Sequence, residues 1–198
     1  FLNQLVESAG ASPLAFVDAT ATNLPAGLLL YTAQASFGDM DGDNDLDLVL
    51  ANLGSLVPAP SVFYDALLLN NGAGVFTDAT VGRMPLNADN TVSVELADFD
   101  ADGDLDIAYG NFRALSSTQG PPQANRLYLN NGAAFFTDVT VPNLPDGNRV
   151  TFPLQPTNDL AVLDFDLDGD LDIFAANGVF GATPLPGVVN NLYVNNGN

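Results

Sequence analysis

A run of alternating aspartates constrains the fold of this chain more than any other feature. Asp98–Asp106 reads D-F-D-A-D-G-D-L-D, so five carboxylates are spaced by two residues with Gly103 between them. In an extended strand all five would lie on one face and repel one another. A bound hard cation removes this conflict, because calcium takes six to eight oxygen ligands and a tight acidic loop can supply most of them. The stretch is therefore interpreted as a metal-binding loop.

The acidic loop occurs three times. Asp164–Asp172 reads D-F-D-L-D-G-D-L-D and Asp39–Asp47 reads D-M-D-G-D-N-D-L-D. In the earliest copy Asn44 stands where the others have glycine, and asparagine is the next best residue for a turn with positive φ. The copies begin at residues 39, 98 and 164, which gives steps of 59 and 66 residues. Such a spacing indicates a repeat architecture.

Two further motifs keep the step of the loops. One is L-x-x-N-N-G, in which asparagine and glycine favour a hairpin turn after a strand. The other is F-x-D-x-T, in which the aspartate is expected to form a turn and the phenylalanine to lie in the core. The copies are 67–72, 127–132 and 192–197 for the first motif, and 16–20, 76–80 and 136–140 for the second. They divide one repeat domain, 1–198, into a partial repeat 1–25, repeats 26–85 and 86–145, and an incomplete repeat 146–198.

The pattern within a repeat predicts strands and almost no helix. Apolar residues alternate with polar ones, and turn residues separate the runs. Four short antiparallel strands in about 60 residues make up one propeller blade. The predicted fold is all-β, with about three propeller-type blades that are open or completed by another chain. The third repeat lacks a fourth strand, and Phe16–Thr20 carries such a strand at the other end. In the middle repeat the strands are expected at 92–97, 105–109, 126–130 and 134–139.

Composition limits the possible partners and chemistry. The net charge is −20, with four arginines, no lysine and no histidine, and 15 of the 24 acidic residues lie in the three loops. This charge argues against nucleic acid and anionic membrane as partners. No apolar run is long enough to span a membrane, so no membrane insertion is expected. Without cysteine, histidine or lysine the usual nucleophiles and bases are missing, and no enzyme activity is expected.

The loops and the two motifs resemble the FG-GAP/VCBS repeat family, the calcium-bearing blades of integrin-α-like propellers, and are closest to bacterial VCBS repeats. The resemblance covers nearly the whole chain, although residues 5–15 fit it less well. It implies that the first, third, fifth and ninth loop positions supply side-chain oxygens and the seventh its backbone carbonyl. About three Ca²⁺ ions are then expected. The implied ligands are Asp39, Asp41, Asp43, Asp45 and Asp47; Asp98, Asp100, Asp102, Asp104 and Asp106; and Asp164, Asp166, Asp168, Asp170 and Asp172.

Two rival interpretations of the loops are weaker. An EF-hand needs a glutamate at its twelfth position and flanking helices, but Tyr109 and Ala175 occupy that position and both flanks are strand-like. Magnesium keeps several water ligands and rarely takes a site made only of protein oxygens. Calcium with a structural role is therefore favoured, because each loop joins two strands of its own blade and contributes no histidine.

These inferences predict an extracellular, non-enzymatic, calcium-binding module for adhesion or structure. Its partners would be other copies of itself or a protein or glycan ligand, bound through the long connections 53–61, 112–123 and 178–189. An alternative is a filament subunit assembled head to tail, in which the fourth strand of one chain completes the open blade of its neighbour. A third is an accessory propeller fragment of a larger secreted enzyme. The absence of cysteine neither supports nor excludes secretion.

Overall fold

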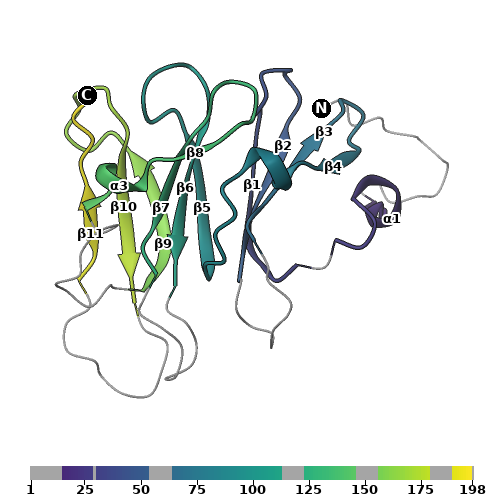
Figure 1. Cartoon of the computed structure of the whole chain (residues 1–198), viewed down its shortest axis with the longest axis horizontal. Helices are drawn as coiled ribbons and strands as arrows, with labels where there is room; N and C mark the ends of the chain where they lie inside the picture. Colours follow the sequence, from purple (N-terminus) through teal and green to yellow (C-terminus); the bar gives the residue numbers. More distant parts are fainter. Residues whose placement is uncertain are drawn as a thin grey trace, which may run out of the picture.

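The fold consists of three antiparallel sheets that lie side by side (Figure 1). The computed structural model describes residues 15–28, 30–53, 64–112, 123–145, 156–178 and 189–197. The predicted all-β fold of blade-like sheets is confirmed. The first blade comprises β1 Thr32–Gly38, β2 Asp47–Asn52, β3 Ala66–Asn70 and β4 Phe76–Asp78; the second comprises β5 Thr91–Ala97, β6 Asp106–Asn111, β7 Arg126–Leu129 and β8 Thr137–Asp138; the third comprises β9 Thr157–Leu163, β10 Asp172–Asn177 and β11 Asn191–Tyr193.

The register places each acidic loop in the first hairpin of its blade. The last residue of the first strand pairs with the ninth aspartate of the loop, as in Gly38↔Asp47 and Ala97↔Asp106. The N-N-G motif closes the hairpin of the third and fourth strands, where Asn70 pairs with Phe76. The fourth strand of the second blade is shorter than the predicted 134–139, because only Thr137–Asp138 keeps ladder pairing with β7.

Most of the core lies between blades, and a smaller cluster around Leu50 and Leu68 lies on the first blade. Val49 and Leu67 of the first blade pack with Val94 and Tyr109 of the second in one buried cluster. A second cluster joins the second and third blades and contains Phe99, Ala108, Leu127, Leu160 and Ile173. The first strands β1, β5 and β9 contact one another in that order. A face of each sheet is therefore buried by packing against the neighbouring blade.

The threonine of each F-x-D-x-T motif begins a four-residue turn that the sequence did not predict: α1 Thr20–Asn23, α2 Thr80–Arg83 and α3 Thr140–Asn143. The backbone of α2 and α3 is not helical throughout, because Val81, Gly82 and Val141 depart from helical angles. The motif aspartate forms the predicted turn, because Asp78 and Asp138 each accept the backbone N–H of the following threonine at 3.0 Å. In the described residues no helix is long enough to cross a membrane.

Two expectations for the first F-x-D-x-T copy are wrong. Phe16 is 93% exposed instead of lying in the core, and residues 15–19 form no strand. The reason is that β4 and β8 form by pairing with the third strand of their own blade, and the described residues offer Phe16 no such edge. The other two phenylalanines follow the prediction more closely, since Phe136 is buried and Phe76 packs against a buried cluster.

The motif threonine extends the ladder beyond the fourth strand. Thr140 is 2% exposed, and its hydroxyl accepts the backbone N–H of Leu127 at 3.1 Å. Thr80 has the same role toward Leu67.

We expect Thr140→Val to lower the free energy of unfolding by about 1–2 kcal/mol, because it leaves a buried N–H unpaired. Urea unfolding measures this change. Thr137→Val, at an exposed position of β8, should change stability by less than about 0.5 kcal/mol; equal losses in the two variants would contradict the prediction.

Candidate metal centres

Each acidic loop brings three carboxylates together. In every loop one oxygen from each of three aspartates lies within 4.8 Å of the other two. The first and third loop positions contribute in all three loops, whereas the third partner is the fifth position in the first loop and the ninth in the other two. The clusters are Asp39, Asp41 and Asp43; Asp98, Asp100 and Asp106; and Asp164, Asp166 and Asp172. Like charges this close repel one another, and a bound cation or a proton would relieve the repulsion.

The first and fifth positions shape the turn. Asp98 accepts the backbone N–H groups of Asp102 and Gly103 at 3.1 and 3.0 Å, and Asp102 accepts that of Asp104 at 2.9 Å. Gly103 has φ +98°, and in the first loop Asn44 takes the same region with φ +72°. The expected equivalence of asparagine and glycine at the sixth position is therefore confirmed. These bonds aim carboxylate oxygens at the middle of the loop before any ion binds.

The fourth loop position is also left-handed, which the sequence did not reveal. Gly42 has φ +77°, and at the same position Ala101 and Leu167 have φ +59° and +63°. Left-handed backbone costs a residue with a Cβ about 1–2 kcal/mol. With Asn44, the loops therefore hold three non-glycine residues in left-handed backbone.

The ninth aspartate connects the loop to the sheet. Asp106 is fully buried, and its two oxygens accept the backbone N–H groups of Phe99 at 2.9 Å and Asn130 at 2.8 Å. Burial raises its pKa to about 6, and the two hydrogen bonds oppose that shift. Asp47 and Asp172 bond in the same way to the second loop residue and to the first asparagine of N-N-G. One carboxylate thus ties three strands together at the edge of the cluster.

The third position is the least satisfied of the cluster. One carboxylate oxygen of Asp41 is buried without a hydrogen-bond partner among the described residues, and so is one oxygen of Asp164 at the first position. Loss of hydration, and then repulsion from the fifth-position carboxylate, raises the pKa of Asp41, Asp100 and Asp166. A divalent ion bound in the loop would satisfy these oxygens and reverse the repulsion. The donor set, made only of oxygens, suits calcium.

The seventh-position side chains lie elsewhere. Asp45, Asp104 and Asp170 belong to none of the three clusters. Each carboxylate lies instead against the glycine of the N-N-G turn of its own blade, where a Cβ would collide with it. Those glycines are Gly72, Gly132 and Gly197. This arrangement is compatible with a ligand role for the backbone carbonyl alone at this position, as the resemblance implied.

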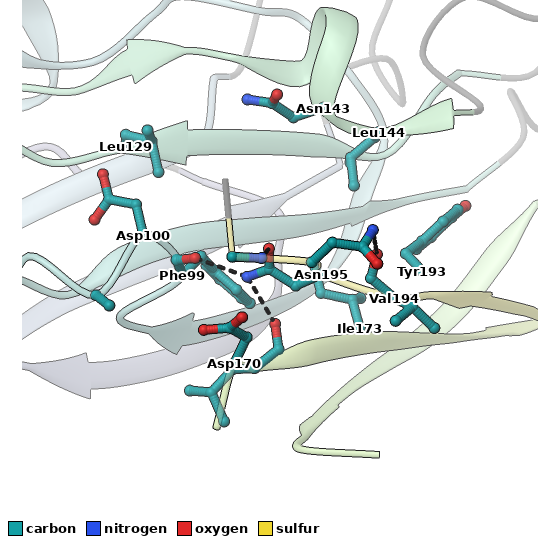
Figure 2. Close-up of a pocket in the computed structure, with 14 residues that line it drawn as sticks. Phe99, Asp100, Leu129, Asn143, Leu144, Asp170, Ile173, Tyr193, Val194 and Asn195 are labelled. Atoms are coloured by element: carbon teal, nitrogen blue, oxygen red, sulfur yellow. Dashed lines mark hydrogen bonds between the residues drawn. The ribbon is translucent and has the colours of Figure 1, made fainter. Parts of the chain in front are cut away.

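An asparagine from the next blade holds each of the first two loops. The side-chain amide of Asn130, in the second blade, donates to the carbonyl oxygen of Met40 in the first acidic loop at 2.8 Å. Asn195 of the third blade donates in the same way to Phe99 in the second loop at 2.8 Å (Figure 2). These interblade hydrogen bonds connect the second position of an acidic loop to the N-N-G turn of the next blade.

The structure also contains a buried acidic group that the sequence did not single out. Asp65 is 8% exposed and accepts hydrogen bonds from the backbone of Asn52 at 2.8 Å and the hydroxyl of Thr91 at 2.9 Å. Burial raises its pKa to about 7, with repulsion from Asp89 adding to the shift. Asp89 pairs with Arg126 at 2.8 Å, which gives one arginine a role. Since Asp65 and Thr91 lie in different blades, the group joins two sheets.

Asp65 predicts a pH dependence of stability. The folded pKa of about 7 lies above the ordinary value of 3.8, so the folded state binds more protons between these values. The stability that protonated Asp65 contributes to the folded state is fully present below about pH 4 and is lost as the pH rises through 7. The free energy of unfolding of Asp65→Asn should therefore be higher than that of the wild type by roughly 2 kcal/mol at pH 7.5, and the difference should be much smaller at pH 4.5. Urea unfolding in chelator at both pH values measures this difference; a pH-independent difference would contradict it.

The predicted partner-binding connections lie mostly outside the described residues. Only their ends are described, for example Leu53, Phe112 and Val189. Their contribution to a binding surface stays a prediction.

Comparisons with known proteins agree with the repeat pattern. Residues 39–109, which include two acidic loops, match the family described as FG-GAP-like repeat. The chain is 34% identical over 115 residues to cartilage acidic protein 1 of Homo sapiens, across 56% of this chain and 15% of that protein. It is 28% identical over 183 residues to cartilage acidic protein 1 of Xenopus tropicalis, across 85% of this chain and 25% of that protein. The chain thus spans a quarter or less of these curated relatives.

Proposed function

We propose that this chain, whose residues 39–109 match the FG-GAP-like repeat family, is a non-enzymatic, extracellular module for structure or adhesion in which calcium stabilises each blade. The observation that carries the proposal is the repeated cluster of three carboxylates with a buried, unpartnered oxygen in the first and third loops. A structural role suits ions at these positions, because the loops connect the first two strands of a blade and also contact the next blade.

Several features support the extracellular part of the proposal. The relatives are named for cartilage and for acidity, and this chain carries a net charge of −20. Weak calcium modules work outside cells, where calcium reaches millimolar concentration. The loops supply oxygen ligands from aspartates alone, and the chain has no histidine or cysteine to bind a softer metal.

Calorimetric titration with CaCl₂ tests the proposal. The wild type should bind about three ions per chain, one for each carboxylate cluster. Asp100→Asn removes one member of the second cluster and should remove one ion from the stoichiometry. Asn is nearly isosteric, and its side-chain oxygen can still accept the backbone N–H of Asp102 that Asp100 accepts. Asp138→Asn, which changes an aspartate outside the loops, should keep all three ions. No heat of binding at millimolar calcium would refute the proposal.

A further inference from the structure

A threonine–asparagine hydrogen bond recurs at one end of the first hairpin in two of the three blades. In the first blade the hydroxyl of Thr32 donates to the amide oxygen of Asn52 at 2.8 Å. In the third blade Thr157 donates to Asn177 in the same way at 2.9 Å. Each threonine pairs with its asparagine across the ladder, next to a bulge. The bond therefore secures the end of the hairpin that is distant from the acidic loop.

The second blade keeps both residues but not the bond. Thr91 pairs with Asn111 in the same register. Its hydroxyl donates instead to a carboxylate oxygen of Asp65, in the first blade, at 2.9 Å. Asn111 is fully buried, and its amide oxygen has no hydrogen-bond partner among the described residues. One hydroxyl proton thus has to serve two acceptors.

The amide of Asn111 is nevertheless oriented as in the other blades. Its nitrogen donates to the carbonyl of Ala124 at 2.6 Å. The equivalent asparagines donate at 2.8 Å to the carbonyls at the same repeat position, which belong to Tyr64 and Val189. With its nitrogen fixed in this way, the oxygen of Asn111 lies on the side that the threonine hydroxyl occupies in the other blades.

Asp65 is the residue that makes the second blade different. Its repeat position holds asparagine in the other two blades, Asn125 and Asn190. All three side chains accept a backbone N–H from the end of the second strand, at 2.8 to 2.9 Å. An asparagine at position 65 would also offer an amide N–H toward Thr91, whereas an ionised aspartate offers only acceptors. The contact between the first two blades is therefore one proton short.

A proton on Asp65 would satisfy every group of this contact. The carboxylic acid would donate to the oxygen of Thr91 over the same 2.9 Å. The hydroxyl of Thr91 would then be free to donate to Asn111, as its counterparts do in the other blades. Because a buried acceptor without a partner costs stability, the complete chain of donors favours the neutral acid.

The charges around Asp65 favour the same state. The ionisable groups that act on it from the elements packed against it are Asp89, Arg126, Tyr109 and Tyr128. Arg126 pairs with Asp89 at 2.8 Å, so its positive charge is already balanced. Burial raises the pKa of both tyrosines, which therefore stay neutral. The described residues around Asp65 thus provide no second positive charge for its carboxylate.

We propose that Asp65, Thr91 and Asn111 form a proton-controlled latch between the first two blades. In the closed form neutral Asp65 donates to Thr91, and Thr91 donates to Asn111. Loss of the proton turns the hydroxyl toward Asp65 and leaves Asn111 unpaired. Burial raises the pKa of Asp65 to about 7 from 3.8, so the folded state holds this proton at higher pH than the unfolded chain does. The contact therefore tightens as the pH falls through neutrality and loosens as the pH rises.

The latch is separate from the proposed calcium sites. It lies at the far end of β6, since Asp106 of the acidic loop begins that strand and Asn111 ends it. None of its three residues belongs to a carboxylate cluster of the loops. The proposal therefore does not depend on calcium binding, and it can be tested in chelator.

A double-mutant cycle tests the latch through the pH dependence of stability. Urea unfolding at pH 6 and pH 8.5 gives a shift of the midpoint, and the part due to Asp65 is the part that Asp65→Asn abolishes. This part should favour pH 6. In Asn111→Leu it should fall to about half or less, because ionised Asp65 then leaves no buried acceptor unpaired. Asn177→Leu, the equivalent change in the third blade, should leave this part unchanged.

Crystal structures of the wild type at the two pH values give a readout that does not depend on how the variants fold. At pH 6 the hydroxyl oxygen of Thr91 should lie within hydrogen-bond distance of both Asp65 and the amide oxygen of Asn111. At pH 8.5 the bond to Asn111 should be lost. The equivalent bonds of Thr32 and Thr157 should be present at both pH values.

Several results would overturn the latch. If Asn111→Leu left the contribution of Asp65 unchanged, burial alone would hold the proton and the link to Asn111 would be wrong. A Thr91 hydroxyl that stays bonded to Asn111 at pH 8.5, or that does not reach it at pH 6, would contradict the exchange of partners. A wild type whose midpoint shifts with pH as much as that of Asp65→Asn would leave no switch at this position.

Discussion

Saturating calcium is expected to raise the melting temperature of this protein by about 10 °C or more. At a free concentration of 100 times Kd, one site adds about 2.7 kcal/mol to the free energy of unfolding. In a domain of this size 1 kcal/mol corresponds to about 2–4 °C. Three sites of the kind formed by the acidic loops would together exceed the effect of any single substitution considered above. Differential scanning calorimetry in 5 mM calcium and in chelator measures the shift.

A triple variant provides the control for the calcium effect. Asp41→Asn, Asp100→Asn and Asp166→Asn together remove the carboxylates whose pKa values are raised by lost hydration and mutual repulsion. Without calcium this variant should be at least as stable as the wild type, because the repulsion is reduced. With calcium it should show little further shift. Equal melting temperatures of the wild type in calcium and in chelator would contradict a structural role for the ion. An equal shift with magnesium would contradict the assignment of calcium.

Asn130→Ala is expected to lower the free energy of unfolding by about 2–4 kcal/mol, the largest effect of a single substitution outside the metal ligands. Asn130 is 6% exposed, and its amide donates to the carbonyls of Met40 at 2.8 Å and Leu105 at 3.0 Å. Met40 is itself fully buried, so its carbonyl would lose a partner that water does not easily replace. Each buried polar group left unpaired costs about 1–3 kcal/mol.

Asn70→Ala is the matched control for that substitution. Asn70 occupies the same repeat position in the first blade, and its amide donates within its own blade to the carbonyl of Leu46 at 3.2 Å. Both variants lose the same atoms, but only Asn130→Ala breaks a hydrogen bond between blades. The control should lose about 1 kcal/mol. Chemical unfolding in calcium measures both values, and equal losses would show that the bond between blades adds nothing to stability.

The repeated sequence predicted what depends on local pattern. The alternating aspartates, the N-N-G turns and the period-two runs place the hairpins correctly, because strand faces and turns are set by neighbours a few residues away. Asn44 was correctly matched to Gly103 for the same reason. The sequence also indicated that carboxylates of one loop would converge, since a loop of nine residues cannot separate them widely.

The features that the sequence did not predict depend on distant partners. Phe16 has the same local motif as Phe136, yet one is exposed and the other buried, because burial requires a third strand and a neighbouring blade. The left-handed backbone at Ala101 and Leu167 is likewise imposed by the loop as a whole and not by residue preference. The pKa of Asp65 is raised chiefly by burial, and its hydrogen-bond partner Thr91 belongs to another blade, so no local pattern reveals this environment.

The bond from Asn130 to Met40 has a consequence for how the molecule comes apart. Because the turn of one unit contacts the acidic loop of the unit before it, an ion bound in that loop and docking of its neighbour would favour each other reciprocally. A linear array with such nearest-neighbour coupling loses order from its termini, one unit after another, while interior units remain closed. Amide hydrogen exchange should therefore be slowest in the second blade. Removing calcium should reduce the number of residues around that blade that are protected from exchange.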